Sequence, residues 1–536
     1  MEFLKAEKKQ SLTTAKKIYR IKDILKFLQR ENMSELNLMK LQNGSDVRGI
    51  AIEGVEGEHV NLTDKAANLI GQAFVLWLEK KCGKKANELK IGIGRDARIT
   101  GEKLALAVAE GISSTGAKVV NCGLATTPAM FMSIVFDQTK FDGSLMITAS
   151  HLPFNRNGIK FFNVDGGLEH EDIEEILKTA QNLTPQKNSS PFAENFDLLS
   201  IYAEHLKQTI CKELNSTESE KPLAGLKIVV DAGNGDAGFF VDKILIPLGA
   251  NTEGSEFLEP DGMFPNHIPN PENKQAMQAI QKATVQNKAD LGLIFDTDVD
   301  RMSAVFHTGE EVNRDSIIAL FSAILAPDFP GSTIVTDSVT SDRLTFFLEK
   351  KLGLKHLRYM RGYKNVIDKC RELNEKGIVS PLAMETSGHG ALKDNYYLDD
   401  GVFLAVKLIS SLAKASKENK KIESFISELP PAGIEAECRF KIKAEDFKQY
   451  GKKVLEEFKS RAIKNKLNLP ENFEGVRISF HDKNAEGWLL LRLSLHDPVM
   501  PLNIEGKTQK DKDAIVKTAK ELVSGFELLD TTVLDN

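Results

Sequence analysis

Three aspartates alternate with other residues in the segment Asp296-Thr-Asp-Val-Asp-Arg301, directly after the apolar run 291–295. A strand that delivers alternating carboxylates into a loop concentrates hard oxygen ligands, which suit Mg²⁺ better than a thiolate-preferring metal. Three close carboxylates repel one another unless a cation lies between them. An ordinary Asp-rich turn, with Arg301 pairing one carboxylate, is the competing interpretation. The position after a strand favours the metal, so we predict a Mg²⁺ site at Asp296, Asp298 and Asp300.

A second polar loop, Thr148 to Lys160, follows the apolar run 145–147. Ser150 lies on a predicted turn beside a histidine and upstream of Asn, Gly and Lys residues. Such a loop could present a hydroxyl nucleophile among donors that stabilise developing phosphoryl charge. An ordinary Ser/Asn/Gly loop explains this segment equally well. The sequence around Ser150 is not G-x-S-x-G, so acyl hydrolysis gains no support.

A third polar segment, Glu385-Thr-Ser-Gly-His389, follows the run 378–384. A carboxylate and a hydroxyl suit the binding of sugar hydroxyl groups, and a histidine can move a proton near neutral pH. A histidine satisfied within its own loop is the commoner outcome for such a segment. The three polar loops would form one site if the units that carry them packed around a common cleft.

The elements that must position these loops repeat along the chain. Apolar strands starting at Leu89, Leu226 and Ser332 are each followed by a polar loop, a helical pattern closed by glycine, and a second strand. This order predicts three similar α/β domains with mixed, largely parallel sheets, and a C-terminal α+β domain follows after Pro430-Pro431. Linkers are predicted at 184–191, 215–222 and 414–421. The predicted parts are an N-terminal extension 1–40 and domains 41–193, 194–307, 308–428 and 429–536.

The composition excludes several classes of protein. The chain has 536 residues, of which 41% are hydrophobic and 27% charged, as in ordinary globular proteins. Its net charge of −6 disfavours nucleic-acid partners, and its five separated cysteines indicate neither disulfides nor zinc. The sequence contains no apolar run long enough to cross a membrane. We expect a cytoplasmic protein with no nucleic-acid or membrane partner, or an organellar one if residues 1–40 are a targeting segment.

Taken together and in order, these motifs resemble the α-D-phosphohexomutase superfamily, in its phosphoglucomutase/phosphomannomutase branch, over residues 44 to about 505. The metal loop 296–301 resembles the family's metal loop, with Thr297 and Val299 in place of the usual Gly and Ala. The other similar segments are Gly44-Ser-Asp-Val-Arg-Gly49, Gly94-Arg-Asp-Ala-Arg98, Thr148 to Lys160, Pro260 to Glu272, Arg361-Gly-Tyr-Lys364 and Glu385 to His389.

The resemblance implies four domains around a central cleft that interconverts hexose 1-phosphate and hexose 6-phosphate, with glucose or mannose as the sugar. By the same resemblance, Ser150 carries the phosphoryl group and also contacts the Mg²⁺ held by the three aspartates. A bisphosphorylated sugar is the expected intermediate and activator, and the enzyme is expected to be a monomer or dimer. The residues implied for proton transfer are Arg48, Lys160 and His389, and those implied for substrate binding are Arg301, Lys364, Glu385 and Ser387.

The C-terminal phosphate loop departs from the family pattern. Where the family has Arg-x-Ser-Gly-Thr-Glu-Pro and a second Arg, this chain reads Arg492-Leu-Ser-Leu-His-Asp-Pro498 and then Pro501. The loss of a flexible glycine and of one bidentate guanidinium predicts a weaker grip on the phosphate that is not transferred. Arg492, Ser494 and His496 remain as candidate phosphate ligands. This departure leaves open a weakly active homologue that binds sugar phosphates. The pattern Glu385-x-Ser-Gly-His389, which is shared across branches of the superfamily, leaves open a phosphoglucosamine-type mutase.

Overall fold

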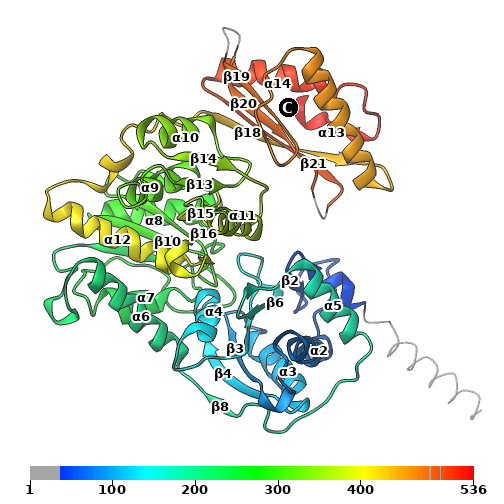
Figure 1. The fold of residues 1–536 in the computed structure, drawn as a ribbon, viewed down its shortest axis with the longest axis vertical. Helices are drawn as coiled ribbons and strands as arrows, with labels where there is room; N and C mark the ends of the chain where they lie inside the picture. Colours follow the sequence, from blue (N-terminus) through cyan, green and yellow to red (C-terminus); the bar gives the residue numbers. More distant parts are fainter. Residues whose placement is uncertain (1–36, 482–484, 495–496, 536) are drawn as a thin grey trace, which may run out of the picture.

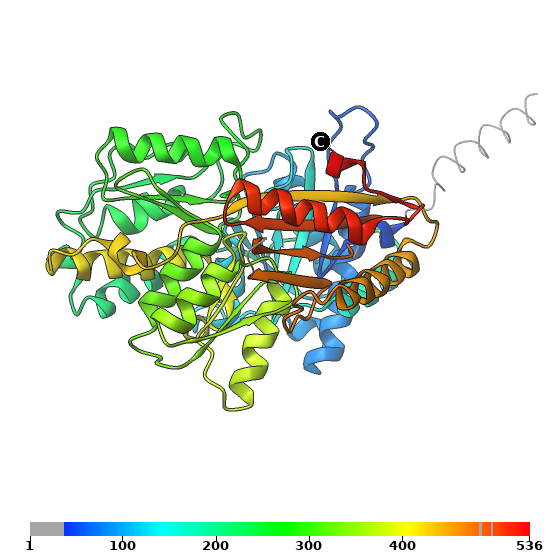
Figure 2. The same ribbon diagram turned by 90° about the horizontal axis from the view of Figure 1, so that it is seen from above.

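The computed structural model describes residues 37–481, 485–494 and 497–535. Residues 1–36 lie outside this range, and with them nearly all of the predicted N-terminal extension. The described chain forms four β-sheets, each with its own helices, and these follow an arc from the first domain to the C-terminal domain (Figure 1). The view from above in Figure 2 shows the antiparallel C-terminal sheet beside its two long helices.

The first sheet has the strand order β1-β2-β6-β5-β3-β4-β8. Its centre is parallel: β3 pairs with β4 and β5, whereas β5, β6, β2 and β1 pair antiparallel. Helices α2 and α3 cover one face and α4 covers the other. The bounds are β1 Gln42–Asn43, β2 Asp46–Ile50, α2 Asp64–Cys82, β3 Lys90–Arg95, α3 Gly101–Ser114, β4 Lys118–Leu124, α4 Thr127–Val135, β5 Gly143–Ile147, β6 Arg156–Asn163, α5 His170–Ala180 and β8 Glu194–Asn195.

The second and third sheets repeat a smaller version of this arrangement. Their strand orders are β12-β11-β10-β9 and β14-β13-β15-β16-β17, with parallel pairs β9/β10, β13/β14 and β13/β15 and antiparallel strands beyond them. The bounds are α6 Leu198–Glu213, β9 Ile228–Asp231, α7 Gly238–Phe240, α8 Lys274–Gln286, β10 Leu291–Phe295, β11 Met302–Phe306, β12 Glu311–Val312, α9 Asp315–Leu325, β13 Thr333–Thr336, α10 Asp342–Phe346, β14 Lys355–Arg358, α11 Tyr363–Glu375, β15 Leu382–Met384, β16 Gly390–Leu392, β17 Leu398–Asp399 and α12 Gly401–Lys417.

The C-terminal domain is an antiparallel sheet of order β19-β20-β21-β18-β22 with two helices on it. In β18, exposed and buried side chains alternate from Glu437 to Ile442, as expected of a strand with one face in the core and one in solvent. The bounds are β18 Ile434–Ile442, α13 Phe447–Lys464, β19 Val476–His481, β20 Glu486–Leu491, β21 Val499–Gly506, α14 Gln509–Val523 and β22 Leu529–Asp530.

The apolar cores divide the molecule unequally. One continuous cluster runs from Met130 in the first domain through Phe295 in the second to Leu404 in the third. The C-terminal domain has a separate core around Phe440 and Phe458. The first three domains are therefore bound by shared apolar packing, which the C-terminal domain does not join.

These observations confirm the predicted fold class of three mixed α/β sheets and a C-terminal α+β domain. Parallel pairing is found on one side of each of these three sheets and extends to the edge strands β8, β9 and β14, whereas the strands that return after each functional loop run antiparallel. The predicted linker at 414–421 is wrong: α12 continues to Lys417, since Ala413 and Ala415 are buried on its apolar face. Among the described residues, no helix is long and apolar enough to cross a membrane.

Candidate active site

The functional loops leave the carboxyl ends of parallel strands, where α/β folds place their ligands. Ser150 follows β5, Asp296 follows β10 and Glu385 follows β15. Metal and sugar loops are also joined through the backbone, because Arg301 and His389 form an isolated antiparallel bridge. The turn of the sugar loop, just before this bridge, needs a glycine. Gly388 there has φ +93°, and a Cβ on it would lie 2.6 Å from the Met302 carbonyl oxygen.

The three aspartates of the metal loop converge as predicted. One carboxylate oxygen from each lies within 4.8 Å of the others. All three side chains are buried, and within the described chain Asp298 Oδ1 and Asp300 Oδ1 have no hydrogen-bond partner. Buried carboxylate oxygens without donors are the ligands that a hard cation requires. The residues present therefore fit a divalent metal ion.

Ser150 lies against this cluster. Its hydroxyl donates to Asp296 Oδ2 at 2.8 Å, although the two residues are 146 positions apart. The backbone of Ser150 has φ +50°, a left-handed conformation that is uncommon outside glycine. The buried Arg98 guanidinium donates to the Ser150 carbonyl oxygen and, at 2.5 Å, to that of Leu152. Arg98 therefore fixes the loop that presents the hydroxyl.

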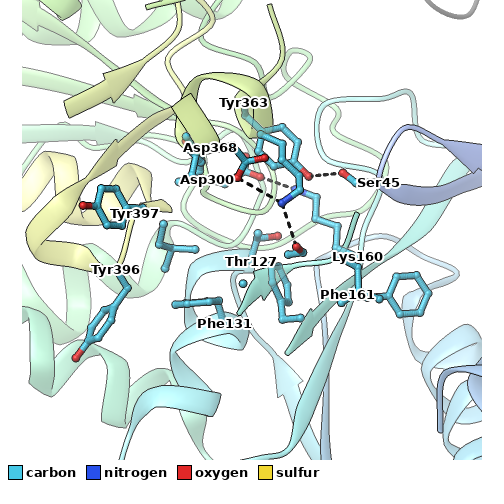
Figure 3. Close-up of a pocket in the computed structure, with 18 of the residues that line it drawn as sticks. Ser45, Thr127, Phe131, Lys160, Phe161, Asp300, Tyr363, Asp368, Tyr396 and Tyr397 are labelled. Atoms are coloured by element: carbon cyan, nitrogen blue, oxygen red, sulfur yellow. Dashed lines mark hydrogen bonds and ion pairs between the residues drawn. The ribbon is translucent and has the colours of Figure 1, made fainter. Parts of the chain in front are cut away.

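Lys160 supplies a positive charge to the metal loop. Its Nζ lies 2.9 Å from Asp298 Oδ2 and also pairs with Asp300 (Figure 3). Burial alone would lower the pKa of Lys160, but the two carboxylates outweigh it and hold the pKa well above its usual value. Asp298 also accepts from the Thr127 hydroxyl at 2.5 Å. Burial would raise the pKa of Asp298, but Lys160 and this hydrogen bond lower it.

Asp296 behaves differently from its two neighbours. Burial, together with the nearby Asp300 charge, raises the pKa of Asp296 to about 8 even though Arg301 opposes the shift. Arg301 is itself buried and pairs with Asp296 Oδ2 at 3.0 Å. Two of its guanidinium contacts reach other loops, to Asn270 Oδ1 at 3.3 Å and Ser150 Oγ at 3.4 Å. Arg301 thus connects the metal loop to the serine loop.

The sugar loop adds a carboxyl, a hydroxyl and an imidazole. Ser387 Oγ lies 2.9 Å from His389 Nδ1, and His389 Nε2 lies 3.6 Å from Asp300 Oδ1. Burial lowers the pKa of His389 to about 3, with Arg301 contributing in the same direction. Burial and the neighbouring Asp337 charge raise the pKa of Glu385 to about 8.

The remaining candidates occupy the edges of this cluster. Arg48 pairs with Asp46 at 2.9 Å. Burial would lower the pKa of Arg48, but Asp46 and then Asp298 raise it. Lys364 lines a cavity between the first and third domains, where Figure 3 shows Tyr363 close to Ser45. Lys364 Nζ pairs with Glu169 at 2.6 Å.

The C-terminal candidates lie apart from the metal loop. Arg492 pairs with Glu474 at 3.3 Å, and the Ser494 hydroxyl accepts from the Asp497 amide at 3.2 Å. Both belong to the hairpin between β20 and β21. His496 lies outside the described residues.

Three residues of this site had no predicted role. Arg98 was visible only as the last residue of the segment Gly94 to Arg98, and its hold on the serine loop spans more than 50 positions. Thr127 gave no sequence signal. Arg361 is recognisable in the sequence only as part of a segment that resembles the family. In the structure, burial would lower the pKa of Arg361, but the charges of Asp337 and Glu385 raise it.

Comparison with known proteins identifies the family. Models of phosphoglucomutase/phosphomannomutase α/β/α domains I, II and III match residues 39–187, 200–309 and 313–432. A phosphomannomutase/phosphoglucomutase of Pseudomonas syringae pv. tomato is 30% identical over 82% of this chain and 88% of its own length. The chain belongs to the α-D-phosphohexomutase superfamily.

Other members are similarly related. A phosphoglucosamine mutase of Ruminiclostridium cellulolyticum is 31% identical over 90% of this chain and 98% of its own length. A solved phosphoglucomutase/phosphomannomutase family protein from Burkholderia thailandensis superposes with a TM-score of 0.72, at 24% identity over 92% of this chain and 98% of that one. This structural likeness supports the fold. The three domain matches follow the predicted domains closely, and the exact boundaries stay a prediction.

Proposed function

We propose that this phosphohexomutase interconverts the 1-phosphate and 6-phosphate of glucose, mannose or both. The observation that carries the proposal is the Ser150 hydroxyl, 2.8 Å from Asp296 Oδ2 at the edge of the three-aspartate cluster. A hydroxyl held against such a cluster suits phosphoryl transfer, because that reaction depends mainly on positioning and on charge stabilisation.

We propose Mg²⁺ as the metal, held by Asp296, Asp298 and Asp300 and contacted by phosphorylated Ser150. The donor set is all oxygen, and two of its oxygens accept no hydrogen bond within the described chain. When bound, Mg²⁺ would neutralise charge on the phosphoryl group.

In the proposed cycle, Ser150 begins as a phosphoserine. The bond between phosphorus and the Ser150 oxygen breaks while a bond from phosphorus to a sugar hydroxyl oxygen forms; the proton of that hydroxyl passes to a nearby base, and the Ser150 oxygen takes up a proton. The resulting sugar bisphosphate turns over in the cleft and returns its other phosphoryl group to Ser150, whose hydroxyl gives up its proton while the sugar oxygen that loses phosphorus takes one up. A hexose bisphosphate added from solution would phosphorylate Ser150 and so activate the enzyme.

We assign the proton transfers to Lys160 and His389, which lie beside Asp300, and to Arg48, whose pKa burial would lower but Asp46 and Asp298 raise. Arg301 and Lys160 would also balance the negative charge of the phosphoryl group. Glu385 and Ser387 would bind sugar hydroxyls, because a carboxyl and a hydroxyl offer the acceptors and donors that sugars need. Lys364, Arg492, Ser494 and His496 are proposed ligands of the phosphate that is not transferred.

The experiment that tests this function is a phosphorus NMR time course. Glucose 1-phosphate, mannose 1-phosphate and glucosamine 1-phosphate are supplied separately, with Mg²⁺ and a trace of glucose 1,6-bisphosphate. Conversion of glucose or mannose 1-phosphate that is lost in Ser150→Ala supports the proposal. Ser144→Ala is the matched control, because Ser144 lies on β5, the strand that precedes Ser150, and its hydroxyl donates to the Met130 carbonyl oxygen away from the three aspartates.

Each of the other outcomes overturns the assignment in a defined way. Conversion of the glucosamine ester alone would favour the phosphoglucosamine-type mutase; the Ruminiclostridium cellulolyticum phosphoglucosamine mutase is as similar to this chain as the Pseudomonas syringae enzyme is. Binding of sugar phosphates by folded, phosphorylated protein without any conversion would instead indicate a sugar-phosphate-binding homologue.

A further inference from the structure

Glu474, in the segment before β19, occupies an anion-binding position between two domains. Its Oε2 accepts from the Ser338 hydroxyl at 2.5 Å and from the Arg361 backbone N–H at 3.0 Å, both in the third domain. Its Oε1 accepts from the Arg492 guanidinium at 3.3 Å, in the C-terminal domain. The Glu474 side chain is only 19% exposed, so this contact is largely shielded from solvent.

These three donors are of the kind that bind a phosphate ester. A hydroxyl, a main-chain N–H and a guanidinium are common phosphate ligands, and arginine binds carboxylates and phosphates with the same planar array of donors. Arg492 is also the cation proposed for the phosphate that is not transferred. The Glu474 carboxylate thus binds the Arg492 guanidinium, which the phosphate of the substrate would need.

Other contacts besides those of Glu474 dock the C-terminal domain onto the third domain. Arg477 donates to the Ser338 carbonyl oxygen at 3.2 Å and to Asp342 at 3.0 Å. Its guanidinium also lies 4.1 Å from the ring centre of Trp488, which packs with Val339. Docking through Arg477 and Trp488 does not need Glu474, so this carboxylate can leave Arg492 without separating the domains.

The same turn that holds Glu474 also holds the sugar loop. Arg361 and Gly362 are consecutive, and while the Arg361 amide donates to Glu474, the Gly362 amide donates to Glu385 Oε1 at 2.7 Å. Gly362 has φ +116°, a conformation that L side chains rarely adopt, at the point where the chain enters α11. The position taken by Glu474 therefore adjoins the proposed sugar-binding residue.

We infer that Glu474 is an internal competitor for the substrate's phosphate: its carboxylate must leave Arg492, Ser338 and the Arg361 amide before a phosphate ester binds there. The inference rests on the proposed function, since it concerns the phosphate site of the same cleft. Glu474 makes this site selective, because a dianionic phosphate ester competes with a carboxylate for the guanidinium better than a neutral sugar does.

The test compares Glu474→Gln with the unaltered chain by titration calorimetry, using glucose 1-phosphate and Mg²⁺. Glutamine keeps the size of the side chain but removes the charge that competes for Arg492. We expect the dissociation constant for glucose 1-phosphate to fall by about tenfold, the usual effect of one charge-assisted hydrogen bond. In turnover assays KM should fall while kcat does not rise with it. Glu486→Gln is the control, because Glu486 lies in the same domain but pairs with Lys507. The dissociation constant of Glu486→Gln for glucose 1-phosphate should equal that of the unaltered chain.

Two further variants decide the interpretation. Glu474→Asp keeps the charge but shortens its reach, so its affinity for glucose 1-phosphate should lie between those of the unaltered chain and Glu474→Gln. This variant also serves if the glutamine variant fails to fold. With Arg492→Ala added, the gain from Glu474→Gln should disappear.

Unchanged or weaker binding in both Glu474 variants would overturn the inference, because it would mean that Glu474 only positions Arg492. A gain that survives Arg492→Ala would overturn it too. Failure of the proposed function is a separate result: the unaltered chain would then bind glucose 1-phosphate without converting it, and the comparison of dissociation constants would still decide the role of Glu474.

Discussion

Lys160 and the proposed Mg²⁺ depend on the same two carboxylates, and this makes their competition measurable. Lys160→Met keeps an unbranched apolar side chain but removes the charge that lies 2.9 Å from Asp298 Oδ2 and also contacts Asp300. Both carboxylates are at most 3% exposed. Removing one partner of a buried ion pair costs about 3–5 kcal/mol, because the other partner is left uncompensated. We expect a loss of that size in EDTA.

Excess Mg²⁺ should restore much of this stability, because a divalent cation can replace the missing ammonium. If the cost of Lys160→Met falls by about 3 kcal/mol on adding Mg²⁺, the linkage of binding to folding requires the variant to bind Mg²⁺ about a hundredfold more tightly. Thermal unfolding of the unphosphorylated protein in EDTA and in Mg²⁺ measures the first quantity. Mg²⁺ titration calorimetry measures the second. A melting shift of about 2–4 °C per kcal/mol is expected for a unit of 150–250 residues.

Lys407→Met is the matched control. Lys407 also joins two carboxylates, Glu213 at 2.6 Å and Asp394 at 2.8 Å, but none of these belongs to the metal loop. The decrease in the free energy of unfolding caused by Lys407→Met should be the same in EDTA and in Mg²⁺. The reasoning is refuted if Lys160→Met binds Mg²⁺ no more tightly than the unaltered chain, or if Mg²⁺ leaves its stability deficit unchanged.

The other predictions concern buried contacts around the site. Thr127→Val removes the hydroxyl that donates to Asp298; it should raise the pKa of Asp298 and lower the free energy of unfolding by about 1.5–3 kcal/mol, measured by urea denaturation. Arg98→Lys cannot supply the four carbonyl contacts of the serine loop, so bisphosphate should label Ser150 at least about tenfold more slowly, followed by mass spectrometry; equal labelling would contradict this. The pKa of His267, which burial would lower, is raised by its contact with Asp231 at 2.9 Å. Because the pKa is higher in the folded state, the contact of protonated His267 contributes its full stability below about pH 6.5, and this stability is lost as the pH rises through the folded-state pKa. In urea titrations His267→Gln should therefore lower the free energy of unfolding more at about pH 6 than at about pH 9.

The loops that do chemistry could be predicted because each leaves a recognisable apolar strand. Ser150, Asp296 and Glu385 lie just beyond the runs that the structure shows as β5, β10 and β15. Local pattern was enough here, since strand ends determine where such loops emerge. The same local pattern predicted the antiparallel C-terminal domain.

Contacts between distant segments could not be predicted. The hold of Arg98 on the serine loop and the contact of Glu474 with Ser338 join residues more than 50 positions apart. The linker predicted at 414–421 failed for a related reason. Its Lys, Ser and Asn residues suggested a loop, but Ala413 is buried in the shared core and α12 continues to Lys417. Tertiary packing outweighed local composition.

The division of the cores also separates chemistry from substrate binding. Asp298, in the second domain, is held by Thr127 and Lys160 from the first domain. Because the first and second domains share one apolar cluster, a change in the metal loop disturbs packing in both domains. Arg492 instead belongs to a domain with its own core, whose contacts with the third domain are polar groups together with Phe473, Trp488 and Leu490. Substitutions in the loop 492–501 can therefore alter the affinity for phosphate without displacing Ser150 or the aspartates. It follows that the departures from the family pattern in this loop should affect KM more than the chemistry of transfer.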